Sequence, residues 1–145
     1  MTKLGKLSIR DEKIGLLNYF INAAYSFKWM LFVRCFMSKL FHLELPRLKY
    51  PLRLPHPYGV IVNPKVIIGK NVTIYQHVTI GSKQFGNNMG IPQVEDDVVV
   101  YPNALIIGNI VIGAGSVVGG GSVVLDNVPP GTIVAGNPAR VIKKL

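Results

Sequence analysis

The sequence predicts a mainly β protein, with a parallel coil of short strands over residues 54–145 and a helical segment and linker over residues 1–53. Three observations lead to this prediction. Aliphatic residues recur every six positions in the second part, valine, isoleucine and glycine are concentrated there, and aromatic residues are concentrated before it. A fixed short period of aliphatic residues is typical of a solenoid, in which each repeat stacks on its neighbour.

Two positions define the six-residue repeat. The first position is Val or Ile, at Val62, Ile68, Ile74, Ile80, Val94, Val100, Ile106, Ile112, Val118 and Val124. The fifth position is small or β-branched, at Val66, Val72, Val78, Val98, Ala104, Ile110, Ser116, Ser122 and Val128. Because a strand rises ~3.3 Å per residue, six residues make one short side, and three sides close a coil of about 18 residues. We expect the first position to fill the interior and the fifth to lie inside a tight corner.

The repeat loses its phase once. The step from Ile80 to Val94 is longer than one hexad, because this hexad has gained eight residues. These residues belong to a polar loop, 81–93, that must leave the wall of the coil. Loops on a rigid scaffold often carry function, and we predict a functional loop, with a tolerated insertion as the alternative.

The first part of the chain has apolar residues at helical spacing, for example Leu16, Tyr19, Phe20 and Ala23. We predict one long or two shorter helices, which start near Asp11 and Glu12, end before Pro46 and Pro51, and lead into an extended linker to about Pro55. The helices are expected to cover the first end of the coil.

The other end of the coil is expected to be closed by residues 127–145. In this segment Pro129, Pro130 and Gly131 are predicted to stop the coil, after which a last strand turns back.

The net charge of +9 is uneven, because residues 1–53 carry ten Lys/Arg and three Asp/Glu while residues 54–145 carry six and four. A basic first third indicates an anionic partner, such as a membrane surface under a basic amphipathic helix, or else a solvated helical face. We expect no nucleic-acid partner, since no recognised binding motif accompanies the charge.

Two further features bear on where the protein acts. The single cysteine, Cys35, excludes an internal disulfide. The apolar stretch 14–27 lacks a signal-peptide pattern and is too short to span a bilayer. We therefore expect a cytoplasmic protein, with the inner face of the membrane as a variant of that location.

The run HPYGVIVNPKVIIGKNVTIYQHVTIG at residues 56–81, the loop, and VPPGTIVAGNPARVI at residues 128–142 resemble the hexapeptide-repeat acyltransferases. The most similar branch is the serine acetyltransferase-like group, which includes O-acetyltransferases of capsule and exopolysaccharide synthesis. The resemblance covers about residues 54–145. It implies a left-handed β-helix, a homotrimer with sites between subunits, acetyl-CoA as co-substrate, and no metal.

The resemblance also implies a catalytic residue. His56 matches the family's general base, and a neutral imidazole suits proton removal from a hydroxyl near pH 7. However, Pro55 stands where the family has Asp, Ile91 where it has a second His, and Phe41 where it has an acidic partner, with Glu44 nearby as a substitute. These departures favour a hydroxyl of a sugar or polysaccharide precursor as acceptor, with serine O-acetylation as the alternative.

His77 is the rival for the catalytic role, and its position at a corner is also compatible with a subunit contact. His42, in the helical zone, is the weakest candidate.

Family matching further implies a coenzyme A groove that is built mostly from backbone, with cations for the phosphates near the closing end. The residues it points to are Gly81, Ser82, Lys83, Pro102, Asn103, Gly120, Gly121, Arg140, Lys143 and Lys144. For the basic residues, a solvated tail is the alternative.

Two other classes have weaker support. A γ-type carbonic anhydrase uses a similar prism but needs three zinc-binding histidines, and only three histidines exist here, one of them in the helical zone. A non-catalytic scaffold or binding prism would need neither a histidine nor a coenzyme groove.

Overall fold

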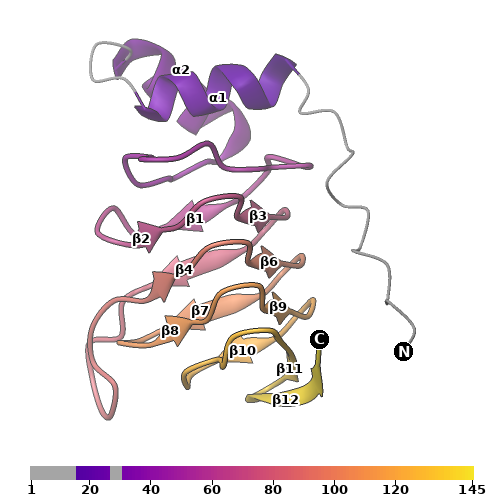
Figure 1. Cartoon of the computed structure of the whole chain (residues 1–145). Helices are drawn as coiled ribbons and strands as arrows, with labels where there is room; N and C mark the ends of the chain where they lie inside the picture. The colour runs from indigo at the N-terminus through magenta and orange to yellow at the C-terminus, as the bar shows by residue number, and fades with distance from the viewer. Residues whose placement is uncertain (1–15, 27–30) are drawn as a thin grey trace.

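The structure is a computed structural model that describes residues 16–26 and 31–145. Two helices, α1 (Leu16–Ser26) and α2 (Leu31–Phe41), lie at one end of a column of stacked coils (Figure 1). The strands are β1 (Ile61–Val62), β2 (Ile67–Ile68), β3 (Thr73–Ile74), β4 (Thr79–Gly81), β5 (Gln93–Val94), β6 (Val99–Val100), β7 (Leu105–Ile107), β8 (Val111–Ile112), β9 (Val117–Val118), β10 (Val123–Val124), β11 (Thr132–Gly136) and β12 (Ala139–Lys144).

Three sheets form the walls of the coil, and all their strands are parallel except β12. Sheet A has the order β1-β4-β7-β10, sheet B the order β3-β6-β9-β11-β12, and sheet C the order β2-β5-β8. In sheet A, Ile61 pairs with Thr79 and Leu105 pairs with Val123, and in both pairs the partner lies three hexads later in the chain. The step from Thr79 to its partner Leu105 is longer, because this coil contains the eight extra residues of the loop. The predicted period and its single break are therefore confirmed.

The core follows the hexad positions. Nine of the ten first-position residues are at most 1% exposed, and all nine fifth-position residues are at most 5% exposed. The exception is Ile68, which is only partly buried. The preceding residues Glu44 and Arg53 bridge to β1 and β3, whereas among the described residues β2 pairs only with β5. Pro92, two residues before Val94, is also buried and fills the fifth position of the interrupted hexad.

Residues 43–54 differ from the predicted linker. Their backbone is extended, but it forms bridges from Glu44 to Ile61 and from Arg53 to Thr73, so it lies on the coil as an irregular first turn. Its interior is filled by leucines, namely Leu43, Leu45, Leu48, Leu52 and Leu54, each at most 5% exposed. Prolines at 46 and 51 interrupt the hexad spacing, which is why the repeat pattern did not reveal this turn.

The two helices cover this first turn, as expected; the predicted helix start at Asp11 and Glu12 lies outside the described residues. The Asn22 side chain donates to the Leu52 carbonyl at 2.8 Å and accepts from the Leu52 amide at 2.6 Å. The Tyr25 hydroxyl donates to the Leu43 carbonyl at 3.0 Å, and burial of this side chain raises its pKa above the usual 10.0. Polar contacts thus join the helices to the coil.

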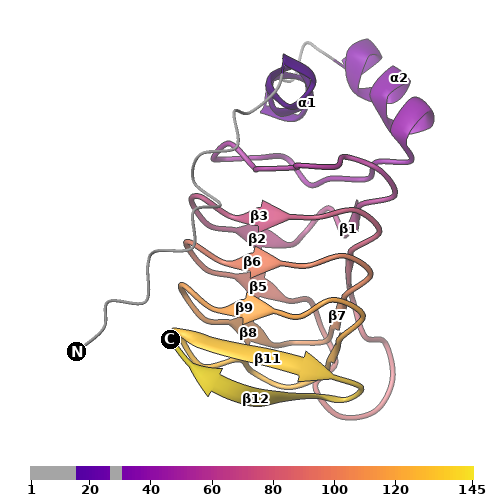
Figure 2. The same ribbon diagram turned by 90° about the vertical axis from the view of Figure 1, so that its right-hand side faces the viewer.

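The far end is closed by a hairpin (Figure 2). The expectation that Pro129, Pro130 and Gly131 stop the coil is wrong, because β11 still pairs in parallel with β9, Ile133 with Val117. The last strand turns back as predicted: β12 is antiparallel to β11.

Candidate functional site

The corner that leads from sheet B to sheet A carries most of the chemistry-bearing residues. We call residues 42, 56–59, 75–77, 101–103 and 119–121 the histidine corner. Five of its positions, one on each successive coil, stack as a ladder of left-handed backbone conformations: His42 (φ 51°), Gly59 (62°), His77 (57°), Asn103 (61°) and Gly121 (67°). Such φ values suit Gly and are tolerated best by Asn, Asp and His.

All three histidines of the chain lie at this corner. Backbone bonds hold the ladder, since the Gly59 amide donates to the Phe41 carbonyl at 2.9 Å and the His77 amide donates to the Tyr58 carbonyl at 2.9 Å. The assignment of His42 to the helical zone was therefore incomplete, because it follows α2 directly and occupies the first step of the ladder. The sequence signal that could have found it is its position before Gly59, at a distance close to one coil.

His77 has a clear structural role. Its backbone occupies a corner where neighbouring coils have Gly or Asn, and its imidazole lies against Gly59. A side chain at Gly59 would collide with the His77 ring, so the two residues fit one another. The geometry therefore gives His77 a role in shaping the corner, and its catalytic role stays a prediction, since His77 is exposed as His56 is.

His56 is exposed and lies beside an aromatic stack. Its ring centroid is 6.3 Å from that of Tyr75, and the Tyr75 ring is parallel to the Tyr101 ring at 5.2 Å, with an interplanar angle of 4°. Phe41 contacts Tyr58 on the same corner, with ring centroids 5.4 Å apart. An imidazole that is open to solvent yet flanked by rings can meet a hydroxyl-bearing ligand.

Sequence reasoning missed Tyr75 and Tyr101. Each follows a first-position residue, and their separation equals one coil once the eight-residue insertion is removed. That spacing could have revealed the stack. Phe41, at the position of the family's acidic partner, packs on Tyr58, whereas Glu44 is exposed and bridges Ile61 in sheet A.

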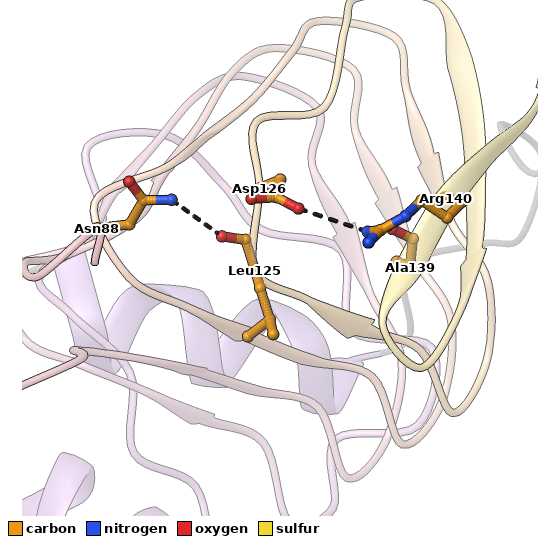
Figure 3. Close-up of polar contacts among 5 residues, drawn as sticks. All are labelled: Asn88, Leu125, Asp126, Ala139 and Arg140. Carbon is orange, nitrogen blue, oxygen red and sulfur yellow. Dashed lines mark hydrogen bonds and ion pairs between the residues drawn. The ribbon is translucent and has the colours of Figure 1, made fainter. Parts of the chain in front are cut away.

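The loop 81–93 leaves the wall as predicted and then runs along the coils below it (Figure 1). Lys83 and Gly90 form an antiparallel bridge with bonds of 2.9 and 3.0 Å. Asn88 accepts from the Asn109 amide at 2.8 Å through its carbonyl, and its side chain donates to the Leu125 carbonyl at 3.4 Å (Figure 3). Among the described residues, these bonds tie the loop to the later coils rather than to the histidine corner.

The predicted site residues fall into three groups. His56, His77, Pro102, Asn103, Gly120 and Gly121 share the histidine corner. Gly81, Ser82 and Lys83 lie where the chain leaves sheet A, at the C-terminal end of β4, whereas the histidine corner precedes this strand. The four residues from His77 to Gly81 span roughly 13 Å at the strand rise. The third group is the set of cations in β12.

The cations of β12 do not converge. Arg140 pairs with Ala135 near the histidine corner, and its guanidinium donates to the Asp126 carboxylate at 3.4 Å (Figure 3). Lys143 and Lys144 pair with Ile133 and Thr132, at the other end of the hairpin. One phosphate group cannot contact all three within a single chain.

Two further findings concern metals and membranes. In residues 16–26 and 31–145, no group of three His, Cys, Asp or Glu side chains could hold a metal ion. In the same part of the chain, no helix is both long and apolar enough to cross a bilayer.

Residues 92–126 match the family described as bacterial transferase hexapeptide (six repeats). The match lies within the part of the coil that follows the loop. The serine acetyltransferase of Buchnera aphidicola is 40% identical over 97 residues, which are 65% of this chain and 36% of that protein. The chain thus spans about a third of the length of this relative.

Solved structures extend the similarity beyond the repeats. The serine acetyltransferase of Neisseria gonorrhoeae has a TM-score of 0.68 at 29% identity, over 88% of this chain and 51% of that one. The serine acetyltransferase of Brucella abortus in complex with coenzyme A has a TM-score of 0.68 at 28% identity, over 88% and 53%. The hexapeptide-repeat coil is a left-handed parallel β-helix, as in these proteins. These matches give the predicted capsule and exopolysaccharide branch no support.

Proposed function

We propose that the protein is an acetyl-CoA-dependent O-acetyltransferase with His56 as general base. The observation that carries the proposal is an exposed imidazole at a corner of a β-helix that matches a coenzyme A-bound serine acetyltransferase over 88% of this chain. The surrounding residues leave this imidazole open to a ligand on the outside of the coil.

The chemistry needs one proton carrier, because a thioester is already activated. His56 accepts the proton of the acceptor hydroxyl as its oxygen attacks the thioester carbonyl. The tetrahedral oxyanion is stabilised by backbone N–H groups, and the C–S bond then breaks. The imidazolium returns its proton to the leaving thiolate, so that an acetyl ester and free coenzyme A result and His56 is neutral again.

For the coenzyme we keep the groove implied by the resemblance. The narrow, amide-bearing arm of coenzyme A would lie along the backbone at Pro102, Asn103, Gly120 and Gly121. At Gly121 there is open space where a side chain would project. Arg140 lies at the end of this corner and is the best placed of the β12 cations for a phosphate, once it exchanges its exposed contact with Asp126. Dependence on acetyl-CoA also agrees with action in the cytoplasm.

Two acceptors are in competition. The names of the relatives favour serine, which makes serine O-acetylation the first candidate. A sugar hydroxyl is the second candidate, favoured by the rings beside His56, since Tyr58 and Tyr75 offer large amphipathic surfaces and Phe41 replaces a charged partner.

We further propose a homotrimer in which the loop of one subunit completes the site of the next. Within one chain the loop bonds to Asn109 and Leu125, on the other edge of sheet A from His56. A loop that serves the reaction would therefore have to reach the histidine corner of a neighbouring subunit.

The test is thiol release from acetyl-CoA in the presence of serine or of a panel of sugars, with sedimentation to measure the mass. We expect acceptor-dependent thiol release by a trimer. Release with serine alone selects the first candidate and release with a sugar alone selects the second. No release with any acceptor, from a protein that binds no coenzyme A, would leave the non-catalytic scaffold.

A further inference from the structure

In the part of the chain that the structure describes, the outer face of the helices is apolar and exposed. We call α1 and α2 together the helical cap. In α2 the exposed residues Phe32, Cys35, Phe36, Lys39 and Leu40 recur with the spacing of one helical face. The exposed fractions of the large apolar side chains of the cap are 78% for Leu16, 67% for Tyr19, 49% for Phe20, 68% for Leu31, 85% for Phe32, 56% for Phe36 and 56% for Leu40.

The inner face of the cap already has its partner. In α1 the residues Asn18, Ile21, Asn22 and Tyr25 are buried, and they recur with the same helical spacing on the opposite side. In α2 no residue is fully buried, and the partly buried Val33, Met37 and Phe41 face the core. An isolated helix of 11 residues is marginal in water, and a surface that covers the outer face would stabilise it.

The charge of the cap selects the kind of surface. The described helices contain Arg34 and Lys39 and no acidic residue, and residues 1–53 as a whole carry ten basic and three acidic side chains. Arg34 stacks on Tyr25, with its guanidinium 5.0 Å from the ring, while Lys39 is exposed on the apolar face itself. We propose that the helical cap binds an anionic lipid surface, with its aromatic and aliphatic side chains in the interfacial layer and its cations among the headgroups.

The position of the cap fits a flat surface. The cap forms one extreme end of the column, and the coils extend away from it (Figures 1 and 2). A plane can therefore cover the outer face without meeting the coils. In the proposed trimer, with its coils side by side, three caps would face the same surface and their weak contacts would act together.

A second copy of the cap is the competing occupant. Two caps face to face would bring basic side chains together with no acidic side chain from either described helix to pair with them. Repulsion between them disfavours this arrangement.

The candidate base lies at the same end of the column as the cap. Phe41, at the end of α2, contacts Tyr58, which is two residues after His56.

The experiment is flotation of the full chain with vesicles of pure phosphatidylcholine or of phosphatidylcholine with phosphatidylglycerol. We expect binding to the anionic vesicles, loss of binding as salt is raised, and little binding to the neutral ones. The double variant Phe32→Ser, Phe36→Ser should reduce the partition coefficient at least roughly tenfold, because two exposed rings no longer enter the interface. Phe85→Ser is the matched control, since Phe85 is 82% exposed but lies on the loop, and it should bind like the parent.

The outcomes separate the occupants. A chain that stays with the solvent in the presence of anionic vesicles overturns the proposal, as does equal binding to both kinds of vesicle. A doubling of the sedimenting mass without lipid, abolished by the Phe32→Ser, Phe36→Ser variant, would assign the face to a second copy. Acetyl transfer to a soluble acceptor is measured separately, so failure of the lipid proposal does not affect the proposed reaction.

Discussion

The coil and the helical cap differ in how they bury their apolar side chains. In the coil, every strand of sheets A, B and C except β12 pairs with a parallel neighbour one coil away, and the first-position side chains fill a closed interior. In the cap, one helical face packs on the first turn of the coil through Asn22 and Tyr25, and the other face presents seven large apolar side chains to solvent. The coil thus buries its apolar surface within itself, whereas the cap leaves part of its apolar surface exposed.

Apart from replacement of His56, the largest expected effect on turnover concerns the loop 81–93, the segment that breaks the coil. Deletion of residues 83–90 leaves Gly81, Ser82, Ile91, Pro92 and Gln93 between Ile80 and Val94, which restores the six-residue phase. We expect the variant to keep the β-sheet circular dichroism spectrum and thermal transition of the parent, and to lose roughly 100-fold in turnover because the loop no longer positions substrate. Full turnover by a folded deletion variant would mean that the loop is a passive insertion.

A core substitution in the coil should have the next largest effect. Ile106 is fully buried in the middle of sheet A, and Ile106→Ala should lower the free energy of unfolding by about 2–5 kcal/mol. Phe36→Ala, in the exposed face of the cap, is the contrast and should change it by less than about 0.5 kcal/mol. Urea denaturation measures both. A large loss for Phe36→Ala would show that the face is covered within the protein itself.

A substitution at the contact between the helical cap and the coil should have an intermediate effect on the free energy of unfolding. Asn22→Ala removes two hydrogen bonds to the Leu52 backbone and leaves that buried backbone without its side-chain partner, at a cost of about 1–3 kcal/mol. Because the loss falls on this contact, limited proteolysis should cut near the cap while the coil stays protected. Asn88→Ala, at an exposed loop contact of 3.4 Å, is the control and should leave the digestion pattern unchanged.

The smallest expected effect is on how the free energy of unfolding depends on pH, through Tyr25 in the helical cap. Burial raises the pKa of Tyr25 in the folded protein above the unfolded value of 10.0, so folding favours the neutral phenol. The stability it contributes is complete below pH 10 and is lost as the pH rises past that value. Tyr25→Phe should make the free energy of unfolding less dependent on pH above this point, and an unchanged slope would contradict the assignment.

The sequence allowed the coil to be predicted in detail because its core is periodic. Every first position from Val62 to Val124 is inside or nearly so, and the phase break located the loop. The first turn at residues 43–54 was missed because prolines disrupt the spacing and its five leucines follow no six-residue rule. Prolines also led to the wrong expectation that Pro129, Pro130 and Gly131 stop the coil, since β11 continues sheet B beyond them.

The candidate site was only partly predictable. Family matching pointed to His56, and the structure places it on an exposed corner. The proximity of Phe41 and His42 to that corner depends on how the first turn stacks, which a repeat pattern does not contain. The separation of Lys143 and Lys144 from Arg140 follows from the direction of β12 in the closing hairpin, since side chains three and four residues away along a strand lie ~10–13 Å apart.

The central claim, that His56 is the base and His77 a corner residue, is tested most directly by thiol release from acetyl-CoA by two variants. His56→Ala should reduce turnover by roughly 10²–10⁴-fold while coenzyme A affinity stays unchanged. His77→Asn places at this corner the residue that the next coil has there, Asn103 with φ 61°, and should fold normally and keep turnover within about tenfold of the parent. Near-normal turnover by His56→Ala, together with loss of turnover by a folded His77→Asn, would contradict the account and assign the base to His77.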